Sequence, residues 1–131
     1  MSDSIHQEIT YPADPKRIYA VLTDAKAFSA LCGGAPTEID AQPGGAFSCF
    51  GGMIQGRNVE CADGKRLVQA WRAKSWDPGK YSIVHLELVP EGKGTRLVLD
   101  HTGFPDGQAE HLSQGWQANY WEPLRKLLEA D

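Results

Sequence analysis

The sequence predicts an α+β domain in which a strongly curved antiparallel sheet wraps around one long C-terminal helix. Three features support this prediction: about six or seven strands in successive short-looped pairs, two short helices after the first strand, and an amphipathic segment at residues 108–130. A chain of 131 residues fits a single domain over 1–131 and can bury a core without disulfides or metal ions.

The amphipathic C-terminal segment is the strongest single signal. Its bulky apolar residues recur at a helical spacing and form one stripe: Leu112, Trp116, Tyr120, Leu124, Leu127 and Leu128. A helix of about 30 Å needs a broad concave partner. Pro123 predicts a kink or a division into two helical pieces, because proline removes a backbone donor. We interpret Gly115, which costs helix propensity, as a point of close approach to another backbone.

The elements before this helix follow from turn signals and alternation. Residues 4–11 predict the first strand, and Asp14 and Asp24 are expected to cap short helices at 16–23 and 25–31. Gly, Pro and Asp clusters then separate one strand from the next, so neighbouring strands should pair antiparallel. The further predicted strands are 37–41, 46–50, 53–61, 65–76, 81–89 and 95–102.

A curved sheet that holds a single helix often leaves an apolar space between them, where small ligands bind. Two residues, Phe28 and Leu31, are expected to form a lid at its mouth. The predicted cavity-lining residues are Phe47, Cys49, Trp71, His101, Trp116 and Tyr120, all on inward-facing positions. Core packing is the alternative role for each of the aromatic residues among them.

His101 is the sharpest polar candidate, because it shares the strand face of Leu97 and Leu99. An imidazole in an apolar cavity can act as a general base. The alternative is a structural histidine that is hydrogen-bonded within the fold, and the sequence leaves both interpretations open.

Composition and motifs disfavour several function classes. The net charge is −4 without a basic run, which disfavours nucleic-acid binding. No apolar run approaches the ~20 residues of a membrane span. Cys32, Cys49 and Cys61 have no CxxC spacing and suit a reducing, cytoplasmic location. We find no HExxH, GxSxG or phosphate-loop motif, so we expect no metal, no cofactor and no catalytic residue other than the weak candidate His101.

Several short motifs resemble one known family when they are taken together and in order. They are PGGAF at 43–47, RLV at 66–68, AWR at 70–72, GTRL at 94–97, HTGF at 101–104 and GW at 115–116. In this order the chain resembles the activator of heat-shock-protein-90 ATPase homologue-like family, within the START-like (SRPBCC) helix-grip superfamily. The resemblance covers essentially the whole chain.

The resemblance implies a helix-grip fold with an internal cavity and a link to the stress response. The first expected partner is a hydrophobic or amphipathic small molecule. The second expectation is that the chain binds a chaperone and stimulates its ATPase. A cyclase- or hydratase-like enzyme that uses the cavity histidine is the third. The co-chaperone that gave the family its name carries a separate N-terminal domain with an Asn- and Trp-rich motif, whereas this sequence starts at its first strand. Outer-face apolar residues such as Ile83 and Val98 make a homodimer plausible.

Overall fold

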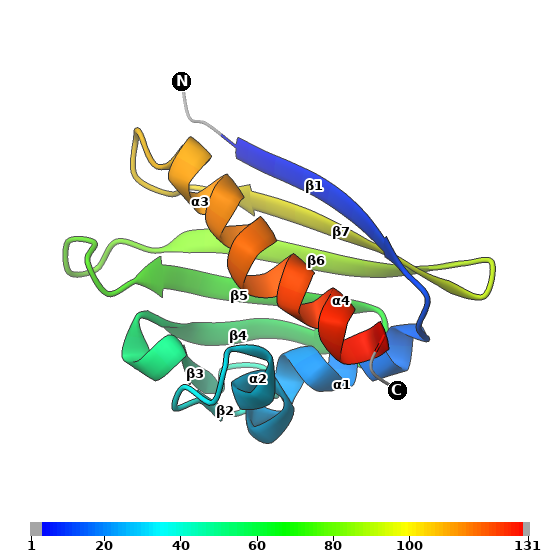
Figure 1. Cartoon of the computed structure of the whole chain (residues 1–131). Helices are drawn as coiled ribbons and strands as arrows, with labels where there is room; N and C mark the ends of the chain where they lie inside the picture. The colour runs from blue at the N-terminus through cyan, green and yellow to red at the C-terminus, as the bar shows by residue number, and fades with distance from the viewer. Residues whose placement is uncertain (1–3, 130–131) are drawn as a thin grey trace.

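The computed structural model describes residues 4–129 and contains a seven-stranded antiparallel sheet that the C-terminal helix crosses on one face (Figure 1). This arrangement confirms the predicted α+β architecture. The strands are β1 (Ser4–Tyr11), β2 (Glu38–Ile39), β3 (Ala46–Cys49), β4 (Ile54–Ala62), β5 (Arg66–Ala73), β6 (Ser82–Glu91) and β7 (Gly94–Thr102).

The strand order is β1-β7-β6-β5-β4-β3-β2, so β1 and β2 form the two edges of the sheet. After β1 the chain crosses to the opposite edge through α1 (Pro15–Thr23) and α2 (Ala25–Leu31), and it returns through antiparallel pairs (Figure 1). Asp14 and Asp24 cap these helices as predicted. Each carboxylate accepts a hydrogen bond from a backbone N–H in the first helical turn, at 2.9 and 2.8 Å.

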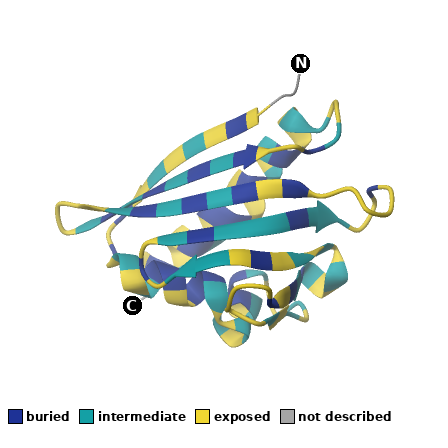
Figure 2. Ribbon diagram, turned by 180° about the vertical axis from the view of Figure 1, so that it is seen from behind, coloured by how far each residue is buried: buried dark blue, intermediate teal, exposed yellow. Residues whose placement is uncertain are grey.

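The two faces of the sheet differ in burial, as the alternation predicts. Val84 lies opposite His101 and Leu86 opposite Leu99, and all four are buried under the helix. Ile83 points the other way and is 46% exposed. Seen from behind, buried and more exposed residues alternate along the central strands (Figure 2). The core therefore lies between the inner face of the sheet and the helix.

The strand predicted at 65–76 ends three residues early, at Ala73 in β5. The chain turns there because the Trp76 N–H bonds to the Ala73 carbonyl at 3.0 Å, and the Arg72 guanidinium bonds to the Trp76 carbonyl at 2.8 Å. This turn carries the Trp76 ring back over Trp71, with ring centroids 5.6 Å apart.

Two other predicted strands are also shorter than expected. The strand expected at 37–41 keeps only Glu38–Ile39, because the chain turns where the Gln42 N–H bonds to the Asp40 carbonyl at 2.9 Å. Phe50, expected to end the next strand, begins a short 3-10 turn, η1 (Phe50–Gly52), and has a left-handed φ of 55°. Its ring lies 5.4 Å from that of Tyr120 on the helix.

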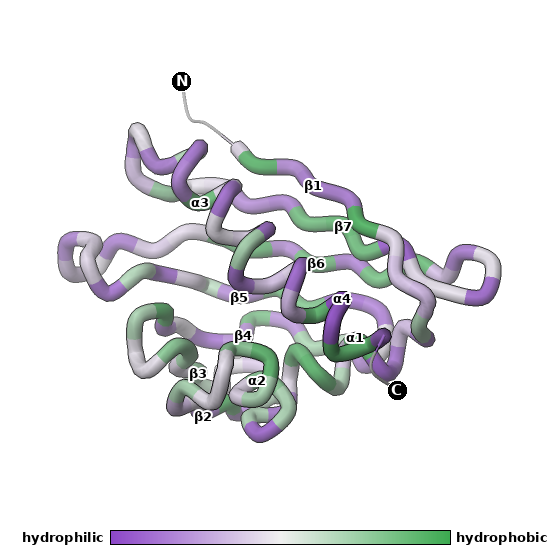
Figure 3. Tube along the Cα trace, viewed as in Figure 1, coloured by the Kyte–Doolittle hydropathy of each residue, from purple (hydrophilic) through white to green (hydrophobic). Residues whose placement is uncertain are grey.

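The C-terminal helix runs without a gap through α3 (Ala109–Trp116), the π-helical segment η2 (Gln117–Trp121) and α4 (Glu122–Glu129). Its predicted stripe faces the sheet, and the hydropathy trace shows apolar residues recurring along it (Figure 3). The buried residues of the helix are Leu112, Trp116, Tyr120, Trp121, Leu124 and Leu128.

The helix is not divided into two pieces near Pro123; its departure from α geometry there is this π segment. Pro123 has no N–H to give to the Asn119 carbonyl, and in the turn before it the Glu122 N–H bonds to the Gln117 carbonyl, five residues back. A π turn adds a residue to the helical repeat. As a result, two consecutive aromatic side chains, Tyr120 and Trp121, are both buried.

Candidate functional site

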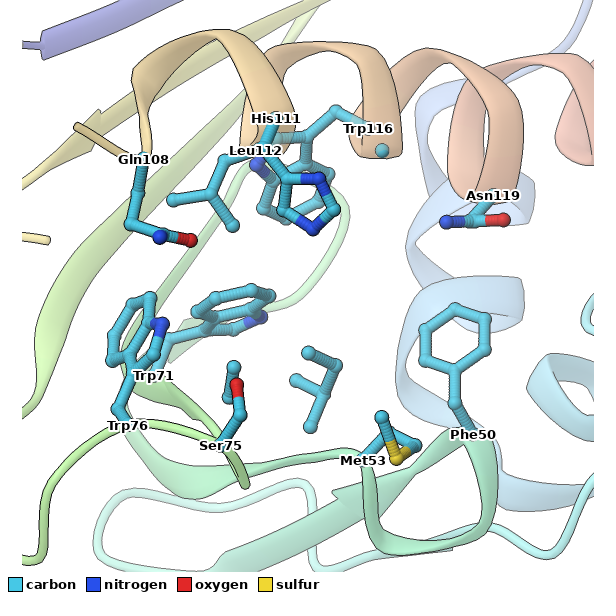
Figure 4. A pocket seen from close by; sticks show the side chains of 13 residues that line it. Phe50, Met53, Trp71, Ser75, Trp76, Gln108, His111, Leu112, Trp116 and Asn119 are labelled. Atoms are coloured by element: carbon cyan, nitrogen blue, oxygen red, sulfur yellow. The ribbon is translucent and has the colours of Figure 1, made fainter. Parts of the chain in front are cut away.

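An open cleft of about 320 Å³ lies between the first half of the C-terminal helix and the nearby ends of the strands (Figure 4). The helix contributes Gln108, His111, Leu112, Gly115, Trp116 and Asn119. The end of β5 and the turn after it contribute Trp71, Ala73, Ser75 and Trp76. The lip on the remaining side is formed by Phe50, Met53 and Ile54.

Three indole rings dominate the walls of this cleft. Trp71 points inward from β5 and stacks on Trp116 of the helix, with centroids 5.8 Å apart and planes at 28°. Trp76 meets Trp71 edge-on at 61°. All three rings are buried against the protein on their other sides, with residue exposures of 8% or less. They are therefore held in place before any ligand arrives.

The rim of the cleft is polar and has no carboxylate, ammonium or guanidinium group. Gln108, His111 and Asn119 project from the helix toward the strand ends, and Ser75 lies across from them (Figure 4). Among the residues lining the cleft there is no Asp, Glu, Lys or Arg. Met53 on the lip is 56% exposed. An apolar floor with a few polar groups at the rim is typical of small-ligand sites.

The space deeper under the helix is filled. A void of only about 20 Å³ remains there, close to what one water molecule needs. Phe28, Phe50 and Tyr120 meet edge-to-face with centroid separations of 5.4 to 5.7 Å. Burial raises the pKa of the Cys49 thiol to about 12 and that of the Tyr120 hydroxyl well above its usual value.

The predicted cavity residues are thus divided between two places. Trp71 and Trp116 line the open cleft. Four of the others, Phe28, Phe47, Cys49 and Tyr120, surround the small void, which Trp116 also touches. Leu31 is buried in the core, and His101 is fully buried. Neither of these two residues lines the cleft or the small void.

Both ring nitrogens of His101 are engaged. The Trp116 indole N–H donates to His101 Nδ1 at 3.1 Å. The other nitrogen, Nε2, lies 2.7 Å from Ser82 Oγ, and the Ser82 hydroxyl donates to the Trp71 carbonyl at 3.0 Å. Since that hydroxyl proton is already used, Nε2 must carry the ring proton and donate to Ser82.

This chain of hydrogen bonds holds His101 neutral. Burial lowers its pKa to about 4, because the charged imidazolium would be removed from water without a carboxylate beside it. The histidine links the two tryptophans of the cleft wall: it bonds to the Trp116 ring and, through Ser82, to the Trp71 backbone.

Two elements of this region escaped sequence reasoning. Trp76 was placed in the predicted strand 65–76, on the face opposite to Trp71. The turn at Asp77-Pro78-Gly79 is the sequence signal that could have ended this strand earlier and placed Trp76 outside it. Gln7 interrupts the apolar positions of β1 because its amide is used: Trp121 Nε1 donates to Gln7 Oε1 at 2.6 Å, and Gln7 Nε2 donates to Ser113 Oγ at 2.8 Å.

The interpretation of Gly115 as a close backbone contact is wrong. A Cβ at this position would meet one atom within 4 Å, the Asn119 amide nitrogen at 3.8 Å. The position opens onto the cleft instead.

Within residues 4–129, no group of three or more His, Cys, Asp or Glu side chains is arranged to hold a metal ion. No helix in this part of the chain has the length and apolar character that crossing a membrane requires.

Comparison with known proteins agrees with the fold and the motifs. The family described as Activator of Hsp90 ATPase homolog 1-like protein matches residues 12–129. The chain belongs to this family. It is 29% identical over 126 residues to activator of 90 kDa heat shock protein ATPase homolog 2 from Mus musculus, and 29% identical over 119 residues to homolog 1 from Homo sapiens.

These alignments cover 96% and 91% of this chain but only 38% and 35% of the two relatives. The chain therefore spans little more than a third of the curated relatives that it matches.

Solved structures of family members show the same START-like helix-grip fold. An HSP90 activator from Plasmodium falciparum superposes with a TM-score of 0.89 at 29% identity, covering 98% of this chain and 96% of that one. A protein described as an Aha1 dimer, from Colwellia psychrerythraea, has a TM-score of 0.81 at 16% identity over 97% and 96% of the two chains, which shows the fold alone. A homodimer of the present chain stays a prediction.

Proposed function

We propose that this chain is a non-catalytic binding domain whose cleft holds a hydrophobic or amphipathic small molecule. One observation carries the proposal: an open cleft, walled by three prepositioned indoles, lies beside a core that is otherwise filled. A volume of about 320 Å³ falls at the lower end of the ~300–1,000 Å³ typical of ligand pockets. The free thiols of Cys32, Cys49 and Cys61 support a reducing, cytoplasmic location for it.

The burial of His101 supports binding rather than catalysis. A general base needs a lone pair that faces the substrate, but Nδ1 accepts from Trp116 and Nε2 donates to Ser82. His101 also does not line the cleft. In this proposal it positions Trp116 and takes no part in proton transfer.

The test is a ligand screen by thermal shift, with the purified chain also examined for a co-purifying compound. We expect apolar and amphipathic compounds to raise the midpoint of unfolding of the native chain. Trp76→Ala should reduce this shift, because Trp76 forms one wall of the cleft. Val59→Ala is the control, since Val59 is 53% exposed and does not line the cleft. No response to any compound would overturn the proposal.

Partner binding of the co-chaperone type is the second candidate function. It is favoured by the relatives of this chain from mouse and human, which are described as activators of the 90 kDa heat shock protein ATPase. The test measures the ATPase rate of a chaperone of this class with and without the chain. Stimulation that saturates with added chain supports the candidate, and an unchanged rate at saturation removes it.

A further inference from the structure

We infer that the cleft selects an uncharged, planar aromatic molecule with a hydrogen-bonding edge, and that Gly115 is the residue that keeps space open for it. This inference rests on the proposed small-molecule function and adds the chemical class of the ligand and a specificity-determining residue. Three independent features support it: the space at Gly115, the indole walls and the uncharged lining.

Gly115 lies at the centre of the helix face that looks into the cleft. The lining positions 108, 111, 112, 115, 116 and 119 span one arc of the helix, with 115 near its middle. Its backbone φ is not in the left-handed region, so the helix does not require glycine for its conformation. Its Cβ position contacts no backbone of another element within 4 Å. Glycine is an unfavourable residue in a helix interior, and here neither packing nor conformation accounts for it.

The walls on either side of this position are flat. Trp71 and Trp116 are stacked at 28°, and Trp76 stands at 61° to Trp71. Indole faces interact best with other planar rings, in stacked or edge-to-face geometry. A flexible alkyl chain would gain apolar burial in this cleft but would not use this geometry.

The polar groups of the cleft favour a neutral ligand. A buried cation would find no Asp or Glu among the lining residues, and a buried anion no Lys or Arg; the one lining side chain that can titrate near neutral pH, His111, is exposed. The side-chain amides of Gln108 and Asn119 can each donate and accept hydrogen bonds, and both project from the helix toward the cleft (Figure 4). They suit a hydroxyl or carbonyl on the edge of an aromatic ring.

Three small probes test the ligand class at neutral pH: 2-naphthol, which is planar and uncharged, 2-naphthoate, which is planar and anionic, and 1-decanol, which is aliphatic and uncharged. Binding is followed by NMR through the indole N–H signals. We expect 2-naphthol to shift the Trp71 and Trp76 signals and to bind at least tenfold more tightly than the other two probes. The Trp121 indole is hydrogen-bonded to Gln7 and does not line the cleft, but its ring stacks on Trp116, so its signal should shift less than those of Trp71 and Trp76.

Two variants of the same helix test Gly115. Gly115→Leu places a side chain in the cleft and should weaken 2-naphthol binding at least tenfold. Ala118→Leu adds a leucine at an exposed position that does not line the cleft, and it should leave the affinity unchanged.

The outcomes distinguish a failure of the proposed small-molecule function from a failure of the inferred ligand class. If none of the probes shifts the cleft signals and the thermal-shift screen is also silent, the proposed function fails. If 1-decanol or 2-naphthoate binds as well as 2-naphthol, the function stands and the inferred ligand class is wrong. If Gly115→Leu binds 2-naphthol like the native chain, the role of Gly115 is overturned.

Discussion

The C-terminal helix covers two different spaces along its length. Under its first half, α3, the cleft of about 320 Å³ is open to solvent. Under Tyr120 in η2 only about 20 Å³ is left, although the same helix lies over the same face of the same sheet. Trp116 borders both spaces and separates them.

A few side chains cause this difference. In the filled region Tyr120 projects from the helix into the rings of Phe28 and Phe50. Five residues earlier, Gly115 places no side chain in the space beneath the helix, and Trp76 lines the far side of that space. The backbone of this fold therefore leaves space between the sheet and the C-terminal helix, and the aromatic side chains at a few positions determine which part of that space stays open.

The largest predicted effect comes from removing the residue that separates the two spaces. Trp116→Ala deletes a ring that stacks on Trp71 and Trp121 and donates to His101 Nδ1. We expect a loss of about 3–5 kcal/mol in the free energy of unfolding, measured by urea denaturation.

Trp76→Ala is the matched comparison for Trp116→Ala. Trp76 faces the open cleft, so its removal leaves less unfilled space behind, and we expect a clearly smaller loss. Equal losses for the two variants would mean that the open and filled regions do not differ energetically as their geometry indicates.

The second prediction concerns pH and the histidine behind the cleft wall. The unfolded chain takes up a proton on His101 near its ordinary pKa of 6.5, whereas the folded protein does so only near a pKa of about 4. Between these values the unfolded state binds more protons, so stability falls as the pH falls. The difference of about 2.5 pKa units corresponds to about 3 kcal/mol lost from pH 6.5 down to pH 4.

Urea denaturation at a series of pH values measures this loss. His101→Gln should flatten the dependence over that window. His85→Gln is the control, because His85 lies half-buried on the outer face of the sheet. An unchanged slope in His101→Gln would show that other groups cause the acid sensitivity.

The sequence was sufficient for the fold because its signals are periodic and local. The stripe from Leu112 to Leu128 and the alternation around Val84 and Leu97 each specify a buried face, and the caps at Asp14 and Asp24 fix helix starts. These features depend on neighbours in the chain. All of them appear in the structure where they were expected.

The cleft was less accessible to sequence reasoning because it depends on contacts between distant elements. Trp71 and Trp116 were predicted as cavity residues and do line the cleft. Trp76 was missed because its place depends on where β5 ends, and His101 could not be assigned without seeing that Ser82 and Trp116 occupy its nitrogens. Whether a predicted cavity is filled depends on the packing of side chains, which periodicity does not report.

The third prediction is a substitution that stabilises the fold, whereas most substitutions destabilise it. Gly115→Ala should raise the free energy of unfolding by about 1 kcal/mol, because alanine is the better helix former and its methyl group would make only an ordinary contact, 3.8 Å from the Asn119 amide nitrogen. The same methyl group narrows the cleft, so affinity for 2-naphthol should fall. Thermal denaturation and titration of one sample measure both effects. A destabilised variant would show that the helix needs glycine for packing, against the geometry seen here.

The smallest predicted effect compares an exposed residue at the lip of the cleft with an equally exposed residue elsewhere. Met53 is 56% exposed and lines the cleft, whereas Val59 in β4 is 53% exposed and does not. Replacing either residue with alanine should change the free energy of unfolding by less than about 0.5 kcal/mol, since little buried surface is lost. Only Met53→Ala should weaken binding of 2-naphthol, because its thioether lies where a bound ring would contact it. If both variants bind alike, the ligand sits deeper against the indoles, and the open lip has no part in recognition.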